Sequence, residues 1–300
     1  MDDRTAKKAQ EMANQALARS RSRALNVLGE KLEEGQLVFW PETERGVPNE
    51  LVRCAVFSAK NRREARRIFR ANEPMRVPVL GGGEVIYIGE ELRQDDETVW
   101  MQLVHLAKEN RSEYAVFNPH SFIKSVGWPN NGASYARLLS CIRRLATAGI
   151  ELYSARFERG MSTKLIVRYE YSNDAGQPWK VQVFDRNDHL LFLFDKLYSR
   201  LEWETRLALP DGLATWLHGF FASHRDPYPH KIETLAVGAG LTIEVDDPTM
   251  DAKLKLKKRQ ARMREIKRLM KTALEALKGQ GFIVSYEISP QGLVSVVRAG

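Results

Sequence analysis

The 300-residue sequence has few cysteines and no long apolar run, and these absences exclude several classes of protein. Its two cysteines, Cys54 and Cys141, lie far apart without metal-ligand spacing, so no disulfide framework is expected and a reducing compartment is the default. No run of about 18 apolar residues could cross a membrane, and the N-terminus lacks the apolar segment of a signal peptide. We therefore expect a cytoplasmic protein.

Sequence signatures of catalysis are missing as well. No Walker phosphate loop is present, and the glycines of Gly81–Gly83 do not complete a dinucleotide-binding pattern. His218 and His224 are six residues apart, which places them on different faces of a helix, so no zinc motif results. No serine or cysteine stands in a recognisable nucleophile signature. We predict a protein that is not an enzyme and that needs no cofactor and no metal.

The sequence does contain enough apolar residues for real cores and a strong excess of positive charge. Hydrophobic residues make up 43% of the chain, which argues against wholesale disorder. The formal net charge of +8 favours a polyanionic partner, and both nucleic acid and an acidic membrane surface fit that description.

The composition changes near residue 48. Residues 1–48 are rich in Ala, Arg, Glu and Lys and have a narrow apolar stripe, so we interpret them as a flexible or partner-dependent arm. We predict a first domain at residues 49–197 and a second at residues 198–300. Each half places a short helix, a break, a basic helix and a β-hairpin in that order. This plan predicts an α+β fold made of tandem winged-helix domains, each a helix–turn–helix with a β-hairpin wing.

In the first half, residues 121–126 and 134–148 read as the helix pair. Residues 150–153 and 164–171 read as the strands of its wing, with a tip near Arg159-Gly160. In the second half, residues 232–237 and about 250–277 read as helices, and residues 282–288 and 293–297 flank a turn.

The positive charge is concentrated in residues 251–271. This stretch has ten Lys and Arg residues against two acidic residues, so its net charge of +8 equals that of the whole chain. A helix that is buried on one side and cationic on the other can lie in a major groove about 12 Å wide. The pattern predicts contacts to double-stranded DNA from Lys255, Lys258, Arg259, Arg262, Arg264, Lys267, Arg268 and Lys271.

Weaker cationic positions occur in the first half. The predicted DNA-binding residues there are Ser134, Arg137, Arg143 and Arg144 on the helix and Arg156, Arg159 and Lys164 near the wing. The alternative for the helix arginines is that they pair with local carboxylates. For both helices the competing interpretation is a solvated basic face.

Several long strings give this sequence a resemblance to the TrfA family of plasmid replication initiators across nearly the whole chain. They lie at residues 25–32, 39–44, 89–97, 203–209 and 215–224. The resemblance implies tandem winged-helix domains that bind repeated origin sites (iterons) as monomers and help to open the adjacent DNA. It also implies cooperation with the host proteins DnaA and DnaB helicase, and dimers that limit copy number. The N-terminus is similar to the shorter form known in that family, without a long leader.

The family is also similar to proteins that contact the sliding clamp through a short apolar peptide. The nearest match here retains Leu191, Leu193 and Phe194 but lacks the leading glutamine. A run of apolar residues is also typical of a buried segment.

Three other functions remain open from the sequence. The strongest is a dimeric winged-helix transcriptional repressor bound to an inverted repeat. A protein held to a membrane or nucleoid surface by its basic helix would show little sequence preference, and a nuclease would cleave origin DNA with a metal. Two non-identical DNA-binding halves favour the initiator, because a dimer needs only one such module per subunit.

Overall fold

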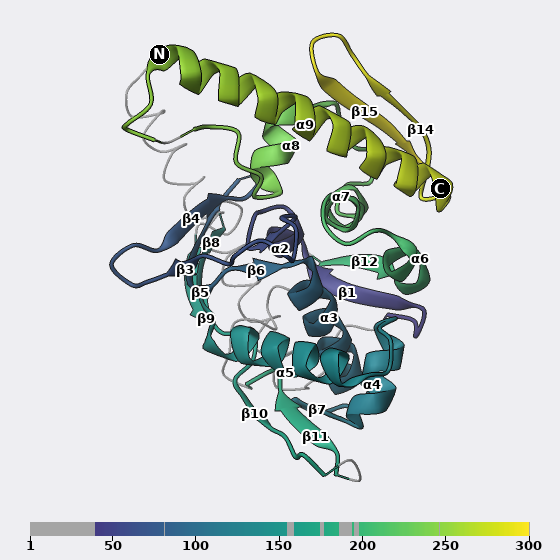
Figure 1. The fold of residues 1–300 in the computed structure, drawn as a ribbon. Helices are drawn as coiled ribbons and strands as arrows, with labels where there is room; N and C mark the ends of the chain where they lie inside the picture. Colours follow the sequence, from purple (N-terminus) through teal and green to yellow (C-terminus); the bar gives the residue numbers. More distant parts are fainter. Residues whose placement is uncertain are drawn as a thin grey trace, which may run out of the picture. The chain divides into compact units, whose positions relative to one another are not determined.

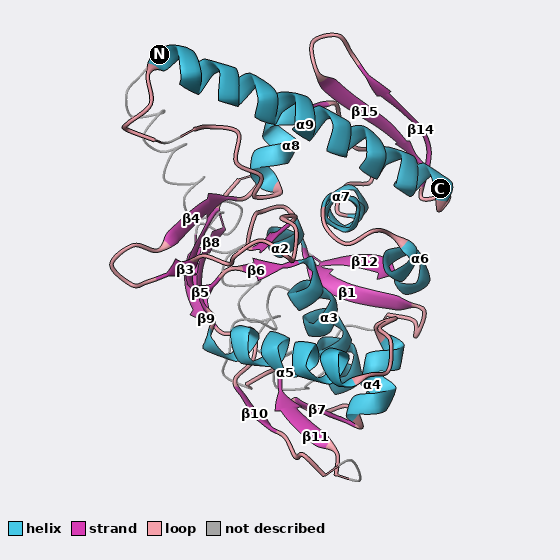
Figure 2. Cartoon of the chain, in the orientation of Figure 1, coloured by secondary structure: helices cyan, strands magenta, loops and turns pink. Residues whose placement is uncertain are grey.

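The chain combines helices with short strands throughout (Figures 1 and 2). A computed structural model describes residues 40–80, 82–154, 159–174, 177–185, 194, 198–245 and 247–299. The first half contains β1 (Glu44–Pro48), α2 (Asn49–Val52), β2 (Phe57–Ser58), β3 (Ile68–Phe69), β4 (Met75–Pro78), β5 (Glu84–Glu90), β6 (Leu92–Arg93), α3 (Gln94–Glu109), β7 (Tyr114–Phe117), α4 (Pro119–Ser125), α5 (Gly132–Thr147), β8 (Gly149–Ser154), β9 (Arg159–Thr163), β10 (Arg168–Glu170) and β11 (Trp179–Gln182). The second half contains β12 (Tyr198–Glu202), α6 (Trp203–Ala208), α7 (Leu213–Ala222), β13 (His230–Lys231), α8 (Ile232–Gly238), α9 (Ala252–Gly279), β14 (Ile283–Ile288) and β15 (Leu293–Arg298).

The strands form small sheets that are mostly antiparallel. In the first half, β3, β5, β8 and β9 follow one another in one sheet, with β4 also paired to β5, and β11 lies between β10 and β7 in another. In the second half, β15 lies between β13 and β14. The short strands β2 and β6 pair in parallel. Each half therefore has a hairpin directly after its basic helix: β8–β9 after α5, and β14–β15 after α9.

Side-chain caps fix where the long helices begin. The Asn131 side chain accepts a hydrogen bond from the backbone N–H of Ser134 at the start of α5, and Asp251 does the same for Leu254 at the start of α9. At α3 the carboxylate of Asp96 accepts from the backbone N–H of Arg93 at 2.9 Å. Such caps satisfy N–H groups that have no partner inside the helix and typically contribute about 1 kcal/mol each.

The basic helices are held by separate apolar cores. In the first half, Leu138 and Ile142 of α5 are fully buried, as are Val99 and Leu103 of α3. In the second half, the buried residues of α9 join one cluster with α7, α8, β14 and β15. These residues are Ile266, Met270, Ala273, Leu274 and Leu277. Because burying one large apolar side chain contributes about 1.5–3 kcal/mol, each core is sufficient to fix its helix.

Most elements expected from the sequence are present. The helix pair near residues 121–148, the helices near residues 232–237 and 250–277 and the last hairpin all occur within a few residues of their predicted bounds. Gly82 and Gly83 lie between two paired strands, β4 and β5. Mixed helix and sheet content is therefore confirmed.

The clearest departure concerns the end of the predicted arm. Residues 44–48 were assigned to it, but they form β1, which pairs with β12 from Glu44↔Glu202 to Pro48↔Tyr198. Residues from before position 49 and after position 197 therefore share a sheet, and residues 39–300 form one compact unit. Two smaller differences are the second strand of the first wing, which is β9 at Arg159–Thr163 and not residues 164–171 as predicted, and α6, which the sequence did not predict.

Candidate nucleic-acid interface

The basic helix α9 has 28 residues and is therefore about 42 Å long. Its buried residues all lie between Ile266 and Leu277, in its second half. From Ala252 to Arg262 almost every residue is exposed, including Leu256 at 54%. The first three turns of α9 therefore extend past the core that holds the rest of the helix (Figure 1).

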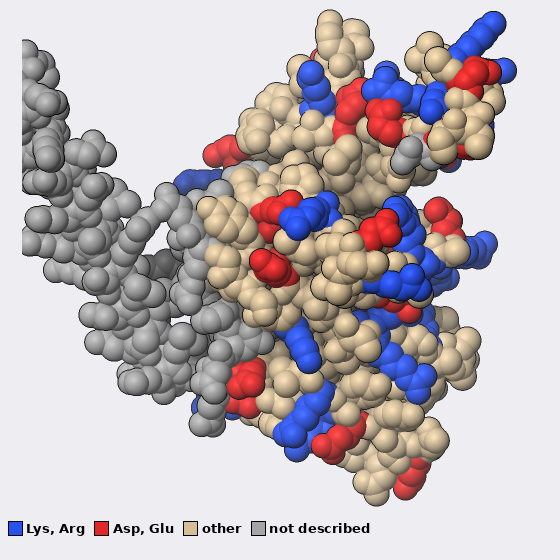
Figure 3. Space-filling model, turned by 90° about the vertical axis from the view of Figure 1, so that its left-hand side faces the viewer, with Lys and Arg blue, Asp and Glu red and all other residues tan. Residues whose placement is uncertain are grey.

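The cations of α9 lie mainly on one side of the helix. At 100° per residue, Lys253, Lys257, Arg264, Lys267, Arg268 and Lys271 share a face that is separate from the buried stripe. All six are exposed. On the face of the molecule displayed in Figure 3, Lys and Arg side chains are interspersed with Asp and Glu. The cationic face of α9 is thus a local feature and does not reflect a uniformly positive surface.

Few described carboxylates neutralise α9. Arg259 Nε lies 3.0 Å from Glu244 Oε1, and Arg268 Nη2 lies 2.6 Å from Glu265 Oε1. Arg262 donates a hydrogen bond to the backbone carbonyl of Glu244. No described carboxylate lies within 4 Å of the charged nitrogens of the other cations of α9, Lys253, Lys255, Lys257, Lys258, Arg264, Lys267, Lys271 and Lys278. Exposed pairs of this kind contribute only about 0–1 kcal/mol, so a phosphate could replace either carboxylate.

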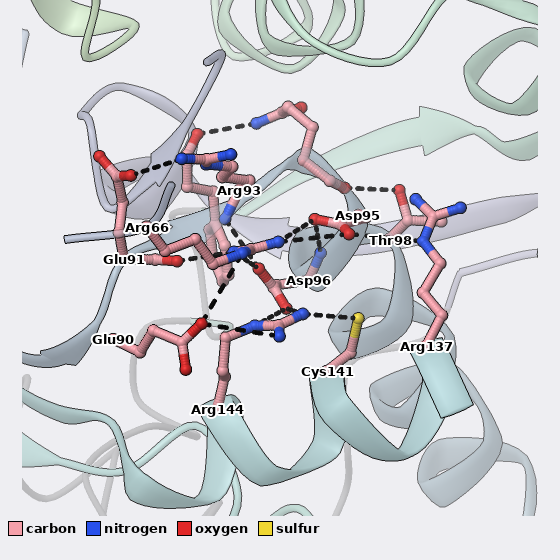
Figure 4. Close-up of polar contacts among 12 residues, drawn as sticks. Arg66, Glu90, Glu91, Arg93, Asp95, Asp96, Thr98, Arg137, Cys141 and Arg144 are labelled. Atoms are coloured by element: carbon pink, nitrogen blue, oxygen red, sulfur yellow. Dashed lines mark hydrogen bonds and ion pairs between the residues drawn. The ribbon is translucent and has the colours of Figure 1, made fainter. Parts of the chain in front are cut away.

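The arginines of α5 have a different environment. Arg144 Nη2 lies 2.8 Å from Asp96 Oδ1, and only 12% of its side chain is exposed. Arg137 contacts Asp95 at 3.4 Å and Asp211 at 3.3 Å. Figure 4 shows both arginines pointing from α5 toward the start of α3. Sequence analysis placed Arg137 and Arg144 in the DNA-binding set. The structure instead gives them the local carboxylate partners that the sequence left open as the alternative.

A third arginine completes this buried cluster. Arg66 Nη1 lies 2.6 Å from Asp96 Oδ2, and its Nη2 lies 3.0 Å from Asp95 Oδ1. Burial by itself raises the pKa of Asp95, but the nearby guanidinium groups of Arg66, Arg137 and Arg144 lower it below its ordinary value. The cluster fixes the position of α5 on α3 and leaves little charge for a ligand.

Ser134 is also internal. It is 6% exposed and is held at the first turn of α5 by the Asn131 cap, so it is not part of an exposed surface as predicted.

The exposed cations beside α5 come mainly from the neighbouring sheet. Arg143 is exposed on α5, and its Nη2 lies 3.3 Å from the Tyr171 hydroxyl. Arg168 on β10 and Lys180 on β11 both lie over the ring of Tyr114, at 5.7 and 4.4 Å from its centroid. The sequence did not single out these two residues, because nothing local shows that their strands join the sheet that contains β7.

The remaining predicted residues near the first wing are described only in part. Lys164 is exposed in the segment after β9. For Arg159 the structure describes the backbone in β9, and Arg156 lies outside the described residues.

The predicted clamp-binding segment is described at one residue. Phe194 is 1% exposed, and its ring lies about 6 Å from the rings of Trp40, Trp100 and Phe184. A clamp-binding peptide must expose its aromatic side chain, so in this structure Phe194 is a core residue and not a contact residue. Leu191 and Leu193 lie outside the described residues.

The described residues show neither a metal centre nor a membrane-spanning helix. No group of three or more His, Cys, Asp or Glu side chains in this part of the chain is arranged to hold a metal ion. None of the helices described here is both long and apolar enough to span a membrane.

Comparisons with known proteins identify the family of this chain. A family model described as TrfA protein matches residues 2–253. The plasmid replication initiator protein TrfA of Escherichia coli is 27% identical over 244 residues, which cover 77% of this chain and 62% of that relative. The chain thus spans less than two thirds of the relative's length. The family match ends at the start of α9, so the body of the basic helix lies beyond it.

Solved structures show the fold at low sequence identity. Domains 2–3 of RctB superpose with a TM-score of 0.50 at 11% identity, over 84% of this chain and 97% of that one. The Pi initiator protein, solved in complex with iteron DNA, gives a TM-score of 0.43 at 11% identity, over 72% of this chain and 98% of that one, which is too low to argue a common fold. Because the family model spans well over half of the sequence, this chain belongs to the TrfA protein family.

Proposed function

We propose that this protein is a plasmid replication initiator that binds repeated sites in origin double-stranded DNA through two winged-helix units. The first unit lies within residues 49–197 and uses α4, α5 and the hairpin β8–β9. The second lies within residues 198–300 and uses α8, α9 and the hairpin β14–β15. Membership in the TrfA family and the replication function of the Escherichia coli relative support this proposal.

The observation that carries the proposal is the exposed cationic face of α9. This helix is anchored by apolar contacts on one side. Its other side presents the six exposed cations of the shared face, and among them only Arg268 has a described carboxylate partner. A helix of about 10–12 Å diameter fits a major groove about 12 Å wide. Each phosphate that a cation neutralises releases condensed counterions. If roughly six of these cations contact phosphates, log K should fall with log salt at a slope of about −5.

The first unit presents a smaller charge to DNA. The exposed positions of α5 include Ala133, Ala136, Arg143 and Thr147, and small side chains allow a close approach to the groove. Arg168, Lys180 and Lys164 lie on the segments that follow α5 and would contact the phosphates that flank it. We infer that α9 supplies most of the electrostatic affinity. Helix α5 contributes mainly a close steric fit to the groove and a few contacts.

Origin opening and host recruitment are the further steps of the proposed function. In this mechanism the free energy for strand opening comes from the occupation of several adjacent repeats. The initiator DnaA and the helicase DnaB are proposed partners because of the family resemblance. Contact with the sliding clamp stays a prediction that requires Phe194 to leave the aromatic core.

Binding and footprinting of the purified chain test this proposal. The chain is titrated with duplexes that contain one copy or several direct repeats of its origin site, and its oligomeric state is measured in the same samples. Monomers that protect direct repeats support the initiator. Protection of an inverted repeat by a dimer supports a transcriptional repressor. Equal binding to random DNA and to anionic vesicles supports a surface-attached protein, and metal-dependent cleavage supports a nuclease.

A further inference from the structure

The short helix α6 connects the two proposed DNA-binding units and contacts both of them. It follows β12 and precedes α7, and Figure 1 places it beside these two elements. On the side of the first unit, Trp203 Nε1 donates to the backbone carbonyl of Ser125, the last residue of α4, at 2.9 Å. Leu207 lies against Gly127, in the turn between α4 and α5. The connection is therefore packed against the helix pair of the first unit.

A single buried arginine of α6 extends this connection to α3 and α7. Arg206 is 1% exposed. Its Nη2 lies 2.9 Å from Glu97 Oε2 and 3.2 Å from Gln94 Oε1, both on α3. Its Nη1 donates to the backbone carbonyl of Thr215 on α7 at 3.4 Å, and its Nε contacts Thr98 Oγ1 at 3.3 Å. The planar guanidinium presents its donors in fixed directions, so these contacts fix α3 and α7 relative to one another.

Other contacts close the same junction. The indole N–H of Trp216 on α7 donates to the carbonyl of Cys54 at 3.2 Å. The backbone N–H of Ala59 donates to the carbonyl of Ala239, at the end of α8, at 2.8 Å. Because α3 packs against α5 and α7 packs against α9, the junction sets the separation of the two basic helices.

We propose that Arg206 is a positioning residue that determines which spacing between half-sites the protein accepts on DNA. This inference rests on the proposed function, since it requires α5 and α9 to contact one duplex. With the junction intact, the two helices meet DNA at one separation and one relative rotation. Without Arg206, the contacts between α3 and α7 are weakened, so the separation and relative rotation of the two units vary more and the protein tolerates a wider range of spacings.

Because of the geometry of B-DNA, the loss of affinity caused by inserted base pairs is a sensitive measure of how rigidly the two units are held. Each inserted base pair moves the second half-site by roughly 3.4 Å along the axis and rotates it by roughly 34°. Two inserted pairs shift it by roughly 7 Å and 70°, which a fixed pair of helices cannot follow. A protein with a loosened junction can follow much of this shift by reorienting one unit.

The experiment uses full-length protein and a DNA probe selected from a random-sequence duplex library by that protein. Affinity is measured for the selected duplex and for versions with one, two or three base pairs inserted at its centre. The variants are Arg206→Met and Glu97→Gln, the second of which keeps the side-chain volume and removes only the charge of the partner. Arg200→Met is the matched control, because Arg200 is 54% exposed on β12 and pairs, among the described residues, with Glu44 alone, at 3.5 Å.

We expect two inserted base pairs to weaken binding about 100-fold for the wild type and for Arg200→Met. For Arg206→Met and Glu97→Gln the same insertion should weaken binding less than about 10-fold. An equal insertion penalty in all four proteins overturns the proposal. A uniform loss of affinity on every duplex, with the penalty unchanged, assigns Arg206 a purely structural role and overturns it too.

A distance measurement without DNA separates this inference from the proposed function. Spin labels are attached at Ala136→Cys on α5 and Thr272→Cys on α9, both exposed positions. The native cysteines Cys54 and Cys141 are fully buried and will not react. The wild type should give one narrow distance distribution, and the Arg206 and Glu97 variants a broadened one. If the library yields no preferred sequence, the proposed function fails. The distance distributions still test the positioning role of Arg206 in that case. Identical narrow distributions in all proteins overturn this role.

Discussion

Helices α5 and α9 have similar sequence patterns but use their arginines in opposite ways. Arg144 of α5 is 12% exposed and paired with the buried Asp96, whereas Arg268 of α9 is 66% exposed and pairs with the exposed Glu265. The difference comes from the neighbouring element. The start of α3 presents adjacent carboxylates to α5, and the outer face of α9 meets no packed element. Helical spacing of cations therefore predicts a cationic face, but the packing partner decides whether that face stays available.

The largest expected effect follows from removing exposed charge on α9. The triple variant Arg264→Gln/Lys267→Gln/Lys271→Gln should weaken binding to the selected duplex on the order of 100-fold and reduce the salt slope by about 3. These side chains are exposed, so the unfolding transition should not move. Binding titrations between 50 and 300 mM salt measure both quantities.

A matched triple variant tests whether the loss of affinity is specific to the cations of α9. Arg62, Arg63 and Arg70 are exposed cations near β3, and their replacement by glutamine gives the same change in net charge. An equal loss of affinity in the two triple variants would show that overall charge, and not the face of α9, drives binding.

The second effect concerns the paired arginine of α5. Arg144→Met should lower the free energy of unfolding by about 3 kcal/mol, because it leaves Asp96 buried with one partner fewer. Arg143→Met, one residue away but exposed, should leave stability unchanged and lower DNA affinity by less than 10-fold. Urea unfolding of both variants gives the comparison. If Arg143→Met destabilises the protein as much as Arg144→Met, the assignment of structural and surface arginines on α5 is wrong.

The third effect is a pH dependence of the core that anchors α9. His218 on α7 is fully buried, and neither ring nitrogen has a hydrogen-bond partner within the described structure. Burial, with smaller effects of Arg206 and Arg298, lowers the pKa of His218 to about 3 from its ordinary 6.5. Between these two values only the unfolded chain binds the proton, so stability is lost as pH falls from 6.5 toward 3.

This loss has an expected size and a control. It amounts to about 1.4 kcal/mol per pH unit, or about 2 kcal/mol at pH 5. Urea unfolding at pH 7 and pH 5 should show this loss in the wild type and a smaller one in His218→Leu. The exposed His120→Leu variant should behave like the wild type. An identical pH response in all three proteins would rule out the buried histidine as its source.

The smallest expected effect concerns the ion pair between Arg268 and Glu265 on the surface of α9. Glu265→Gln removes the carboxylate that pairs with Arg268, so that Arg268 can contact a phosphate without first losing this ion pair. The change should therefore tighten DNA binding about 2-fold and steepen the dependence of affinity on salt. The same change at Glu287, an exposed residue of β14, is the control and should have no measurable effect. A weaker complex with Glu265→Gln would mean that Glu265 positions Arg268 on DNA.

Local periodicity was enough to predict the helices that matter for this site. The apolar steps from Ile266 to Leu277 predict the buried stripe of α9, and Leu138, Ile142 and Leu145 predict that of α5. The long-range pairings could not be predicted in the same way. β1 and β12 are about 150 residues apart, and nothing in either short segment specifies the other.

The sequence also could not predict which cations are exposed and which are paired with buried carboxylates. Arg143 and Arg144 are adjacent in the sequence, yet one is exposed and the other is paired with a residue 48 positions earlier. A sequence pattern shows which side of a helix a residue occupies. It does not show what packs against that side. For the same reason, the sequence did not reveal that Arg206 lies between the two units.

The outer turns of α9 have a thermodynamic consequence. They concentrate like charges on a helical segment that has little tertiary support, and such a segment is only marginally stable alone because its cations repel one another. A polyanion would relieve this repulsion along with providing contacts. Binding should therefore complete the helix as well as attach it, and part of the interaction free energy offsets the entropy lost in ordering these turns.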